Sequence, residues 1–256
     1  MARQGRRAGR AVSFGQVRVA IIAGGFKMIF IDCARKMIKL FSTVFAVAVS
    51  FVTLTAHAQA TAGNAKAGEA INAMCIGCHG IKGYQASFPE VYKVPMISGQ
   101  NAKYIEAALN AYKKGERRHP TMRSIAETLT EQNMADLAAY YSQHGIVEGQ
   151  SVPKEPKAAS PVVASLLGKA NCASCHGANF NSPIDPSYPK IAGQHADYLF
   201  VALKAYKHSD NVSTGRANAI MGGMAKQYTN AELKQMANYL AGLPGDMKVV
   251  PQSRFR

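Results

Sequence analysis

The sequence predicts an all-α protein built from two tandem domains of similar size. Three observations support this: a unit of about 90 residues occurs twice, apolar residues recur at helix spacing in both copies, and neither copy contains a hairpin signal. A stretch rich in proline and lysine, residues 147–160, reads as an extended linker between the copies. We therefore expect domain 1 at residues 59–146 and domain 2 at residues 161–256.

The chain before domain 1 is expected to be absent from the working protein. Residues 1–36 are rich in arginine, and we interpret them as an extension before the true start at Met28 or Met37. Residues 37–58 then follow the order of a secretory signal peptide: a basic start, an apolar run and small residues at the end. An uncleaved membrane anchor is the weaker alternative, because the run of about 15 residues is short for a bilayer that needs about 20. Export to the periplasm follows from this interpretation.

Each copy contains the pattern Cys-x-x-Cys-His, at residues 75–79 and 172–176. This is the attachment motif of c-type haem, in which each thiol bonds to a haem vinyl group and the histidine can bind the iron. A zinc site would bring both cysteine pairs to one ion, but the pairs are 97 residues apart. A thioredoxin-like site would need a βαβ pattern, and neither motif has one around it. Of the five cysteines only Cys33 lies outside the motifs, in the extension. We therefore expect two covalently bound haem c groups, attached through Cys75, Cys78, Cys172 and Cys175, with His79 and His176 as iron ligands.

Helices are expected before each haem motif, after each Gly-Gln element and at the end of each copy. Thr229 and Glu232 match a capping box at the start of the last helix, whereas Thr130 is followed by Asn133 and is expected to supply only the cap. The expected helices, in chain order, are 65–74, 102–113, one starting at Thr130, 162–171, 196–207 and one starting at Thr229.

The duplication also selects candidates for the sixth ligand of each iron. Methionine opposite histidine is usual in cytochromes c and raises the reduction potential. Met122 and Met221 occupy equivalent positions, 47 and 49 residues after the first cysteine of their own motifs. The alternatives are His119 in the first copy and Met224 in the second. The methionines that align with leucine in the other copy are expected to be core residues: Met134 and Met236.

Two prolines are expected to support the axial histidines. Pro95 and Pro189 stand at the start of the repeated element Pro-x-Ile-x-Gly-Gln. A carbonyl at such a proline accepts the Nδ1 proton of the axial histidine, which fixes the ring orientation and raises its basicity as a ligand. The alternative for both residues is an ordinary turn proline.

These motifs together resemble the dihaem cytochrome c-four family, in which one periplasmic chain carries two class I cytochrome c domains. The resemblance rests on the paired haem motifs, the Gly-Gln elements and the methionine before a capped last helix, and it covers about residues 62–244. It implies transfer of single electrons from quinol–cytochrome c reductase or a dehydrogenase to a terminal oxidase, with peripheral association with the membrane allowed. One departure is a segment from Gln194 to Met221 that is five residues longer than its counterpart in domain 1.

The charge of the chain agrees with a protein partner rather than nucleic acid. The full sequence has a net charge of +15, but the strongest arginine cluster lies in the extension, so we exclude nucleic-acid binding. Residues 59–150 carry +1 and residues 151–256 carry +6, which indicates that domain 2 docks an acidic redox protein. The lysines expected to contribute are Lys204, Lys207 and Lys226.

An iron with both axial positions filled has no open site for a substrate, so we expect an electron carrier and not an enzyme. Two alternatives stay open. One is a haem enzyme, of the peroxidase or thiosulfate-oxidising kind, with one replaceable ligand. The other is a cytochrome subunit held permanently on a flavin-containing dehydrogenase.

Overall fold

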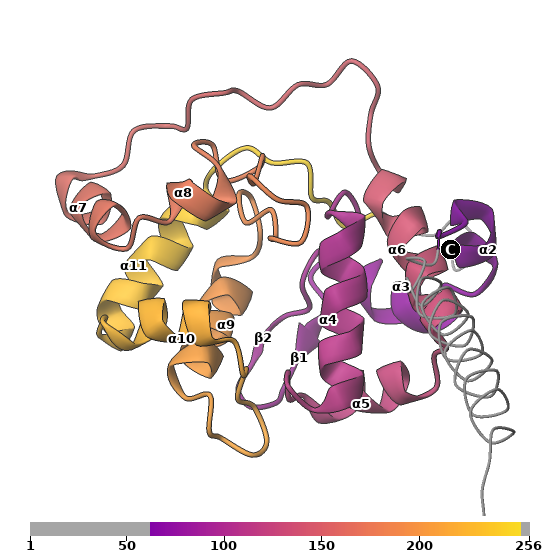
Figure 1. Cartoon of the computed structure of the whole chain (residues 1–256). Helices are drawn as coiled ribbons and strands as arrows, with labels where there is room; N and C mark the ends of the chain where they lie inside the picture. Colours follow the sequence, from indigo (N-terminus) through magenta and orange to yellow (C-terminus); the bar gives the residue numbers. More distant parts are fainter. Residues whose placement is uncertain (1–61, 252–256) are drawn as a thin grey trace, which may run out of the picture. The chain divides into compact units, whose positions relative to one another are not determined.

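Residues 62–251 are described by the computed structural model, and their helices fall into two groups on either side of the long connection after α6 (Figure 1). The expected extension, with Cys33, and the expected signal peptide lie outside the described residues. Within the described part, no helix is long and apolar enough to cross a membrane. The all-α prediction is confirmed for these residues, with one small exception described below.

Domain 1 begins with two short helices where one was expected. Helix α2 (Ala65–Ala70) has Ile71 as its C-cap, and α3 (Ala73–His79) starts after Asn72, which is buried. Asparagine favours helix starts and turns over helix interiors because its side chain competes for backbone hydrogen bonds. The amides of Cys75 and Ile76 both donate to the carbonyl of Asn72, at 2.8 and 2.9 Å, so a new helix starts there. The haem motif is therefore carried on its own helix.

The rest of domain 1 is a helical framework with one strand pair. Helices α2 and α4 pack on α6, and α5 packs on α4. A two-stranded antiparallel pair, with Gln85 opposite Lys93, was not expected from the sequence. Helix α5 was not expected either. The elements are β1 (Gln85–Ala86), β2 (Tyr92–Lys93), α4 (Ala102–Lys114), α5 (Pro120–Glu127) and α6 (Glu131–Gln143).

Domain 2 repeats this framework without the strands. Helices α7 and α9 pack on α11, and α10 packs on α9, as their counterparts do in domain 1. Helix α10 was not expected, whereas α9 has the predicted bounds. The elements are α7 (Pro161–Lys169), α8 (Ala173–His176), α9 (Ala196–Lys207), α10 (Ala219–Lys226) and α11 (Asn230–Ala241).

The caps of the two last helices are more alike than the sequence suggested. Thr229 and Glu232 form the expected capping box. Thr130 also has one, because the Asn133 side chain accepts from the Thr130 amide at 3.1 Å while the Thr130 hydroxyl accepts from the Asn133 amide at 3.1 Å. The expectation of a lone cap was wrong, since the amide oxygen of asparagine reaches back as the carboxylate of glutamate does.

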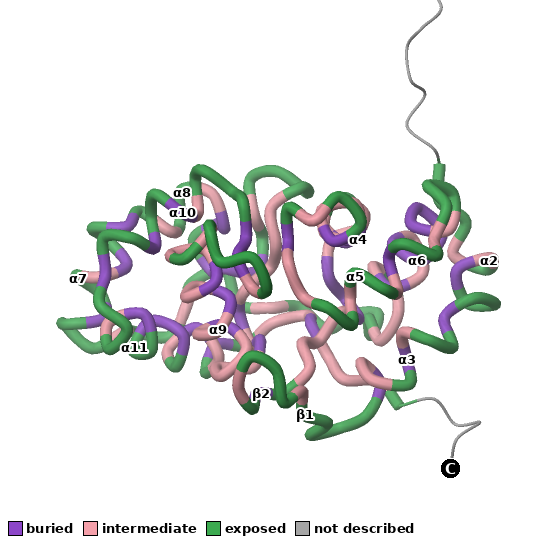
Figure 2. Tube along the Cα trace, turned by 90° about the horizontal axis from the view of Figure 1, so that it is seen from below, coloured by how far each residue is buried: buried purple, intermediate pink, exposed green. Residues whose placement is uncertain are grey.

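Each domain has its own apolar core, and Figure 2 marks buried residues along the helices of both domains. Met134 and Met236 are core residues, as expected. The main core residues of domain 1 are Ile105, Leu109, Met134, Leu137, Ala138 and Tyr141, and those of domain 2 include Val163, Leu167, Leu199, Leu233, Met236 and Leu240.

The segment after α11 runs back to domain 1 (Figure 1). The amide of Lys248 donates to the carbonyl of Ser98 at 3.1 Å, and the two residues form an antiparallel bridge. Met247 is buried, and Asp246 forms an ion pair with Lys190 at 2.6 Å. This segment, residues 246–248, therefore holds the two domains against each other.

Candidate haem sites

The two haem motifs lie at corresponding places in the domains. Cys75, Cys78 and His79 belong to α3. Cys175 and His176 belong to α8, and Cys172 is the N-cap of that helix. All four cysteines are free thiols, as attachment to haem requires. Burial, followed by the nearby Cys78, raises the pKa of Cys75 to about 11, so this thiol is not ionised in the polypeptide alone. No cluster of three or more potential metal-binding His, Cys, Asp or Glu side chains occurs between residues 62 and 251.

The expected support of both histidines by proline carbonyls is confirmed. His79 Nδ1 donates to the carbonyl of Pro95 at 2.7 Å, and His176 Nδ1 donates to the carbonyl of Pro189 at 2.9 Å. Burial lowers the pKa of each histidine, and the carbonyl acts in the opposite direction. With Nδ1 occupied, Nε2 is the ring nitrogen left for a metal, and a neutral imidazole is the form that a metal binds.

The methionine candidates lie on the two helices that the sequence did not predict. Met122 on α5 packs against the same core cluster as Cys75, so the structure brings the thiol and the methionine of domain 1 to one apolar region. Met221 on α10 is half-buried, whereas its competitor Met224 is 37% exposed. His119 caps α5, with Nδ1 accepting from the Met122 amide at 3.4 Å, and Asn218 does the same for Met221 at 2.9 Å.

A pair of buried arginines between the domains was missed in the sequence. Arg117 and Arg216 each lie five residues before the candidate methionine of their domain, and they form an antiparallel bridge with each other. Arg117 donates to the hydroxyls of Tyr104 and Tyr198, at 3.2 and 2.7 Å. Arg216 lies over the rings of Tyr198 and Tyr206, and Arg117 lies over the ring of Tyr112. The signal that could have revealed the pair is its equivalent position in the duplication.

Among the residues that the structure describes, this arginine pair has no acidic partner. None of the ion pairs formed within residues 62–251 includes either arginine, and Arg117 Nε is buried with no hydrogen-bond partner there. Burial acts to raise the pKa of Tyr198, but the two guanidiniums lower it to about 8. Buried charges in proteins are normally paired. Two adjacent unpaired guanidiniums are therefore suited to a bound anion.

These features fit haem c. Each haem would bring two propionates, which supply the missing anions beside Arg117 and Arg216. The free thiols and the free Nε2 of each histidine supply the attachment and one iron ligand. The apolar clusters around Cys75 and Cys172 would surround the rest of the macrocycle. The fit uses equivalent residues in both domains.

The longer loop of domain 2 is held by domain 1. Arg118 Nη1 donates to the carbonyls of Ser209 and Asn211, at 3.2 and 2.8 Å. The Asn211 side chain accepts from the amides of Ser213 and Thr214 and closes a turn. The five additional residues therefore form part of the contact between the domains.

The family model "Cytochrome c" matches the chain twice, at residues 65–144 and 163–244. Cytochrome c4 of Thiocapsa roseopersicina is 31% identical over 194 residues, covering 71% of this chain and 93% of the relative. This chain belongs to the cytochrome c4 family. The crystal structure of reduced recombinant cytochrome c4 from Pseudomonas stutzeri superposes with a TM-score of 0.54 at 26% identity, over 72% of this chain and all of that one. A protein named thiosulfate dehydrogenase electron acceptor, from Thiomonas intermedia, is 28% identical, covering 67% of this chain and 79% of the relative.

Membership of the cytochrome c4 family agrees with the fold and with the two haem motifs. The chain is a cytochrome c4-like electron carrier with two covalently bound haem c groups, each in its own cytochrome c domain. Other proteins that exchange electrons are its partners.

Proposed function

We propose that this cytochrome c4-like protein works in the periplasm and passes single electrons between respiratory partners. The observation that carries the proposal is the duplicated site: both domains present a histidine supported by a proline carbonyl and a methionine at an equivalent position. Haem bound there supplies a one-electron Fe(III)/Fe(II) couple.

The proposed axial ligands are His79 and Met122 for the first haem, called haem 1, and His176 and Met221 for the second, called haem 2. The proline carbonyls orient the histidine rings, and the caps at His119 and Asn218 fix the starts of the helices that carry the methionines. With both ligands in place no coordination position is open for a substrate, which favours transfer over catalysis. The arginine pair would neutralise propionates between the domains.

The proposed location depends on the chain before domain 1. We take residues 37–58 as an export signal, residues 1–36 as an extension before the true start, and residues 59–146, 147–160 and 161–256 as domain 1, linker and domain 2. Attachment of haem c in bacteria takes place outside the cytoplasm, which supports export. Intact mass after expression in a host that attaches haem c should show a chain beginning near residue 59, and a retained signal would contradict the export proposal.

The proposed donor is quinol–cytochrome c reductase or a dehydrogenase, and the proposed acceptor is a terminal oxidase. A second candidate is a cytochrome subunit held permanently on a flavin-containing dehydrogenase, and the name of the Thiomonas relative, thiosulfate dehydrogenase electron acceptor, favours a dehydrogenase as the donor. The net positive charge of domain 2 suits an acidic partner in either case. A stable complex with the dehydrogenase on size-exclusion chromatography would support the second candidate, and a salt-sensitive transient reaction would support the first.

The ligands are tested with methionine variants. Met122→Ala and Met221→Ala should each abolish the methionine-to-iron absorption band of one haem and lower its potential, while both haems stay attached. Met224→Ala is the matched control on the same helix, because its side chain is exposed, and it should change neither band nor potential. If Met224→Ala has the effect expected for Met221→Ala, the second ligand is Met224. A wild-type protein without the band at one haem would favour a haem enzyme with a replaceable ligand.

A further inference from the structure

Gln100 and Gln194, the glutamines of the repeated Gly-Gln elements, bind the opposite domain. Each is only 4% exposed. Gln194 Oε1 accepts from the amide of Met96 at 3.0 Å, and Gln194 Nε2 donates to the carbonyl of Met96 at 2.9 Å. Gln100 makes the same two bonds to Lys190, both at 2.9 Å. Each domain thus binds the backbone of the other through an equivalent glutamine.

The residues that these glutamines hold directly follow the prolines that support the axial histidines. The carbonyl of Pro95, which accepts from His79 Nδ1, and the amide of Met96, which donates to Gln194, belong to one peptide group. The peptide group between Pro189 and Lys190 is bonded in the same way, by His176 at its carbonyl and by Gln100 at its amide. Each histidine is therefore connected to a glutamine of the other domain through a single peptide unit.

We propose that Gln100 and Gln194 are positioning residues that set the donor strength of the axial histidine in the opposite domain, an inference that rests on the proposed histidine ligands. The C=O and N–H of a peptide are conjugated, so an acceptor at the N–H makes the carbonyl oxygen more negative. The stronger Nδ1–H···O bond increases the basicity of the ring, which favours Fe(III) and lowers the potential.

Additional hydrogen bonds fix the position of both glutamine side chains. In each one, Oε1 also accepts from the next backbone amide, that of Asn101 at 2.9 Å or of His195 at 3.0 Å. Nε2 of both glutamines also contacts the sulfur of Met247, at 3.2 and 3.5 Å, so Met247 lies between them. With every polar atom engaged, neither side chain can turn away without losing several bonds. A change in how the two domains pack together would therefore alter the hydrogen bonds of both histidines.

The test compares three neutral substitutions by measuring the potential of each haem separately. Gln194→Leu should raise the potential of haem 1, and Gln100→Leu should raise that of haem 2. We expect a two- to tenfold change in the reduction equilibrium, about 18–59 mV for one electron, because direct partners of a metal ligand typically change affinity or activity 10–100-fold and the glutamines act one group further out. The reduction equilibrium of the haem in the substituted domain should change by less than twofold.

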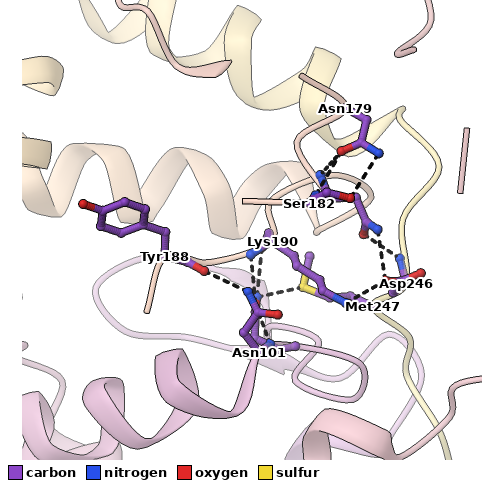
Figure 3. Close-up of polar contacts among 9 residues, drawn as sticks. Asn101, Asn179, Ser182, Tyr188, Lys190, Asp246 and Met247 are labelled. Atoms are coloured by element: carbon purple, nitrogen blue, oxygen red, sulfur yellow. Dashed lines mark hydrogen bonds and ion pairs between the residues drawn. The ribbon is translucent and has the colours of Figure 1, made fainter. Parts of the chain in front are cut away.

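Asn101→Ala is the matched control. Asn101 follows Gln100 and makes one neutral bond between the domains, from Nδ2 to the carbonyl of Tyr188 at 3.0 Å, without touching the peptide group bound to His176 (Figure 3). It should leave both potentials unchanged. Equal shifts in both haems, a larger shift in the substituted domain, no shift in the leucine variants, or a matching shift in Asn101→Ala would each overturn the proposal.

A second readout and a second substitution keep the test decisive. In the reduced protein, exchange of the His79 Nδ1 proton with solvent, followed by NMR, should accelerate in Gln194→Leu, whereas exchange of the His176 Nδ1 proton should stay slow.

If the leucine variants do not hold both haems, Gln194→Glu and Gln100→Glu replace them, since a carboxylate still accepts from the opposite amide. The haem of the opposite domain must then show the larger fall in potential, and a larger fall in the substituted domain refutes the proposal. Failure of the proposed ligands is recognised separately, because the wild-type protein itself would then lack axial-histidine Nδ1–H resonances.

Discussion

The close approach of the first and last helices of domain 1 makes Gly68→Ala a sharp test of its packing. A Cβ at Gly68 would lie 2.1 Å from the carbonyl oxygen of Asp136 and 2.8 Å from the Cβ of Tyr140. Real Cβ contacts are essentially never shorter than 3.0 Å, so α2 would have to move away from α6 by about an ångström. Moving it also strains the bond from the Asn64 amide to the Asp136 carboxylate, at 2.7 Å. The substitution therefore opposes the packing of α2.

The size of the effect follows from two opposing contributions. Overpacking of a tight site costs about 1–3 kcal/mol, and the upper end applies because the clashing atoms at Asp136 are backbone atoms. Replacing glycine by alanine inside a helix returns about 1 kcal/mol. The net destabilisation should be about 2 kcal/mol, a fall in Tm of roughly 4–8 °C for a protein of this size.

The assay is thermal unfolding of the haem-loaded protein followed by far-UV circular dichroism. Gly168→Ala is the control, since Gly168 also lies in a helix but a Cβ there meets nothing within 4 Å. It should leave Tm unchanged or raise it by a few degrees, about the helix-propensity gain. A Gly68→Ala protein as stable as wild type would refute the close-approach reasoning.

Three further predictions concern charge. Although burial acts to raise it, hydrogen bonds from Lys190 and Asn181 hold the pKa of Asp246 below its usual 3.8. This stabilisation is present above pH 3.8 and is lost as the pH falls through the lower folded-state value, so Asp246→Asn should reduce the acid sensitivity of unfolding between these values. Lys226→Glu should slow the reaction with an acidic redox partner about two- to fivefold at low salt and little at high salt, as stopped-flow mixing can show. Arg117→Leu should lower the potential of at least one haem in a redox titration, because a positive charge beside the propionates disfavours Fe(III); unchanged potentials would contradict the propionate assignment.

The structure changes which lysines suit such charge tests. Lys204 forms an ion pair with Glu90 of domain 1, and Lys207 donates to the carbonyl of Tyr228 at 2.7 Å. Reversing either charge would disturb packing as well as docking. Lys226 is exposed at the end of α10 and gives the cleaner measurement. The docking role expected for Lys204, Lys207 and Lys226 stays a prediction, and Lys226 is the residue at which it can be tested without disturbing these contacts.

Much of the fold was predictable because the duplication compares the chain with itself. Helix α9 was located to the residue, and Met134 and Met236 were assigned to the cores because leucine stands at their counterparts. The break at Asn72 was not predictable from periodicity, since the apolar spacing continues through it. Helices α5 and α10 were missed because each has only eight residues.

The contact between the domains was beyond the sequence for a different physical reason. An alignment of the copies shows that Gln100 and Gln194 are equivalent, but not whether a side chain bonds within its own domain or to the other one. Arg117 and Arg216 were also aligned, yet arginine is usually exposed, so nothing in their type suggested burial. The periodicity of apolar residues predicts which face of a helix is buried, but not which domain covers that face.

The segment 246–248 follows α11, the last helix of domain 2, and this gives assembly an order. Domains emerge and fold in sequence during synthesis, so domain 1 can form its core before Met247 is available to contact either glutamine. The contacts that Met247 makes between the domains are thus completed after domain 1 has formed. A chain interrupted just before Asp246 would contain all four motif cysteines and both candidate methionines, and would lack the residue on which the two domains converge.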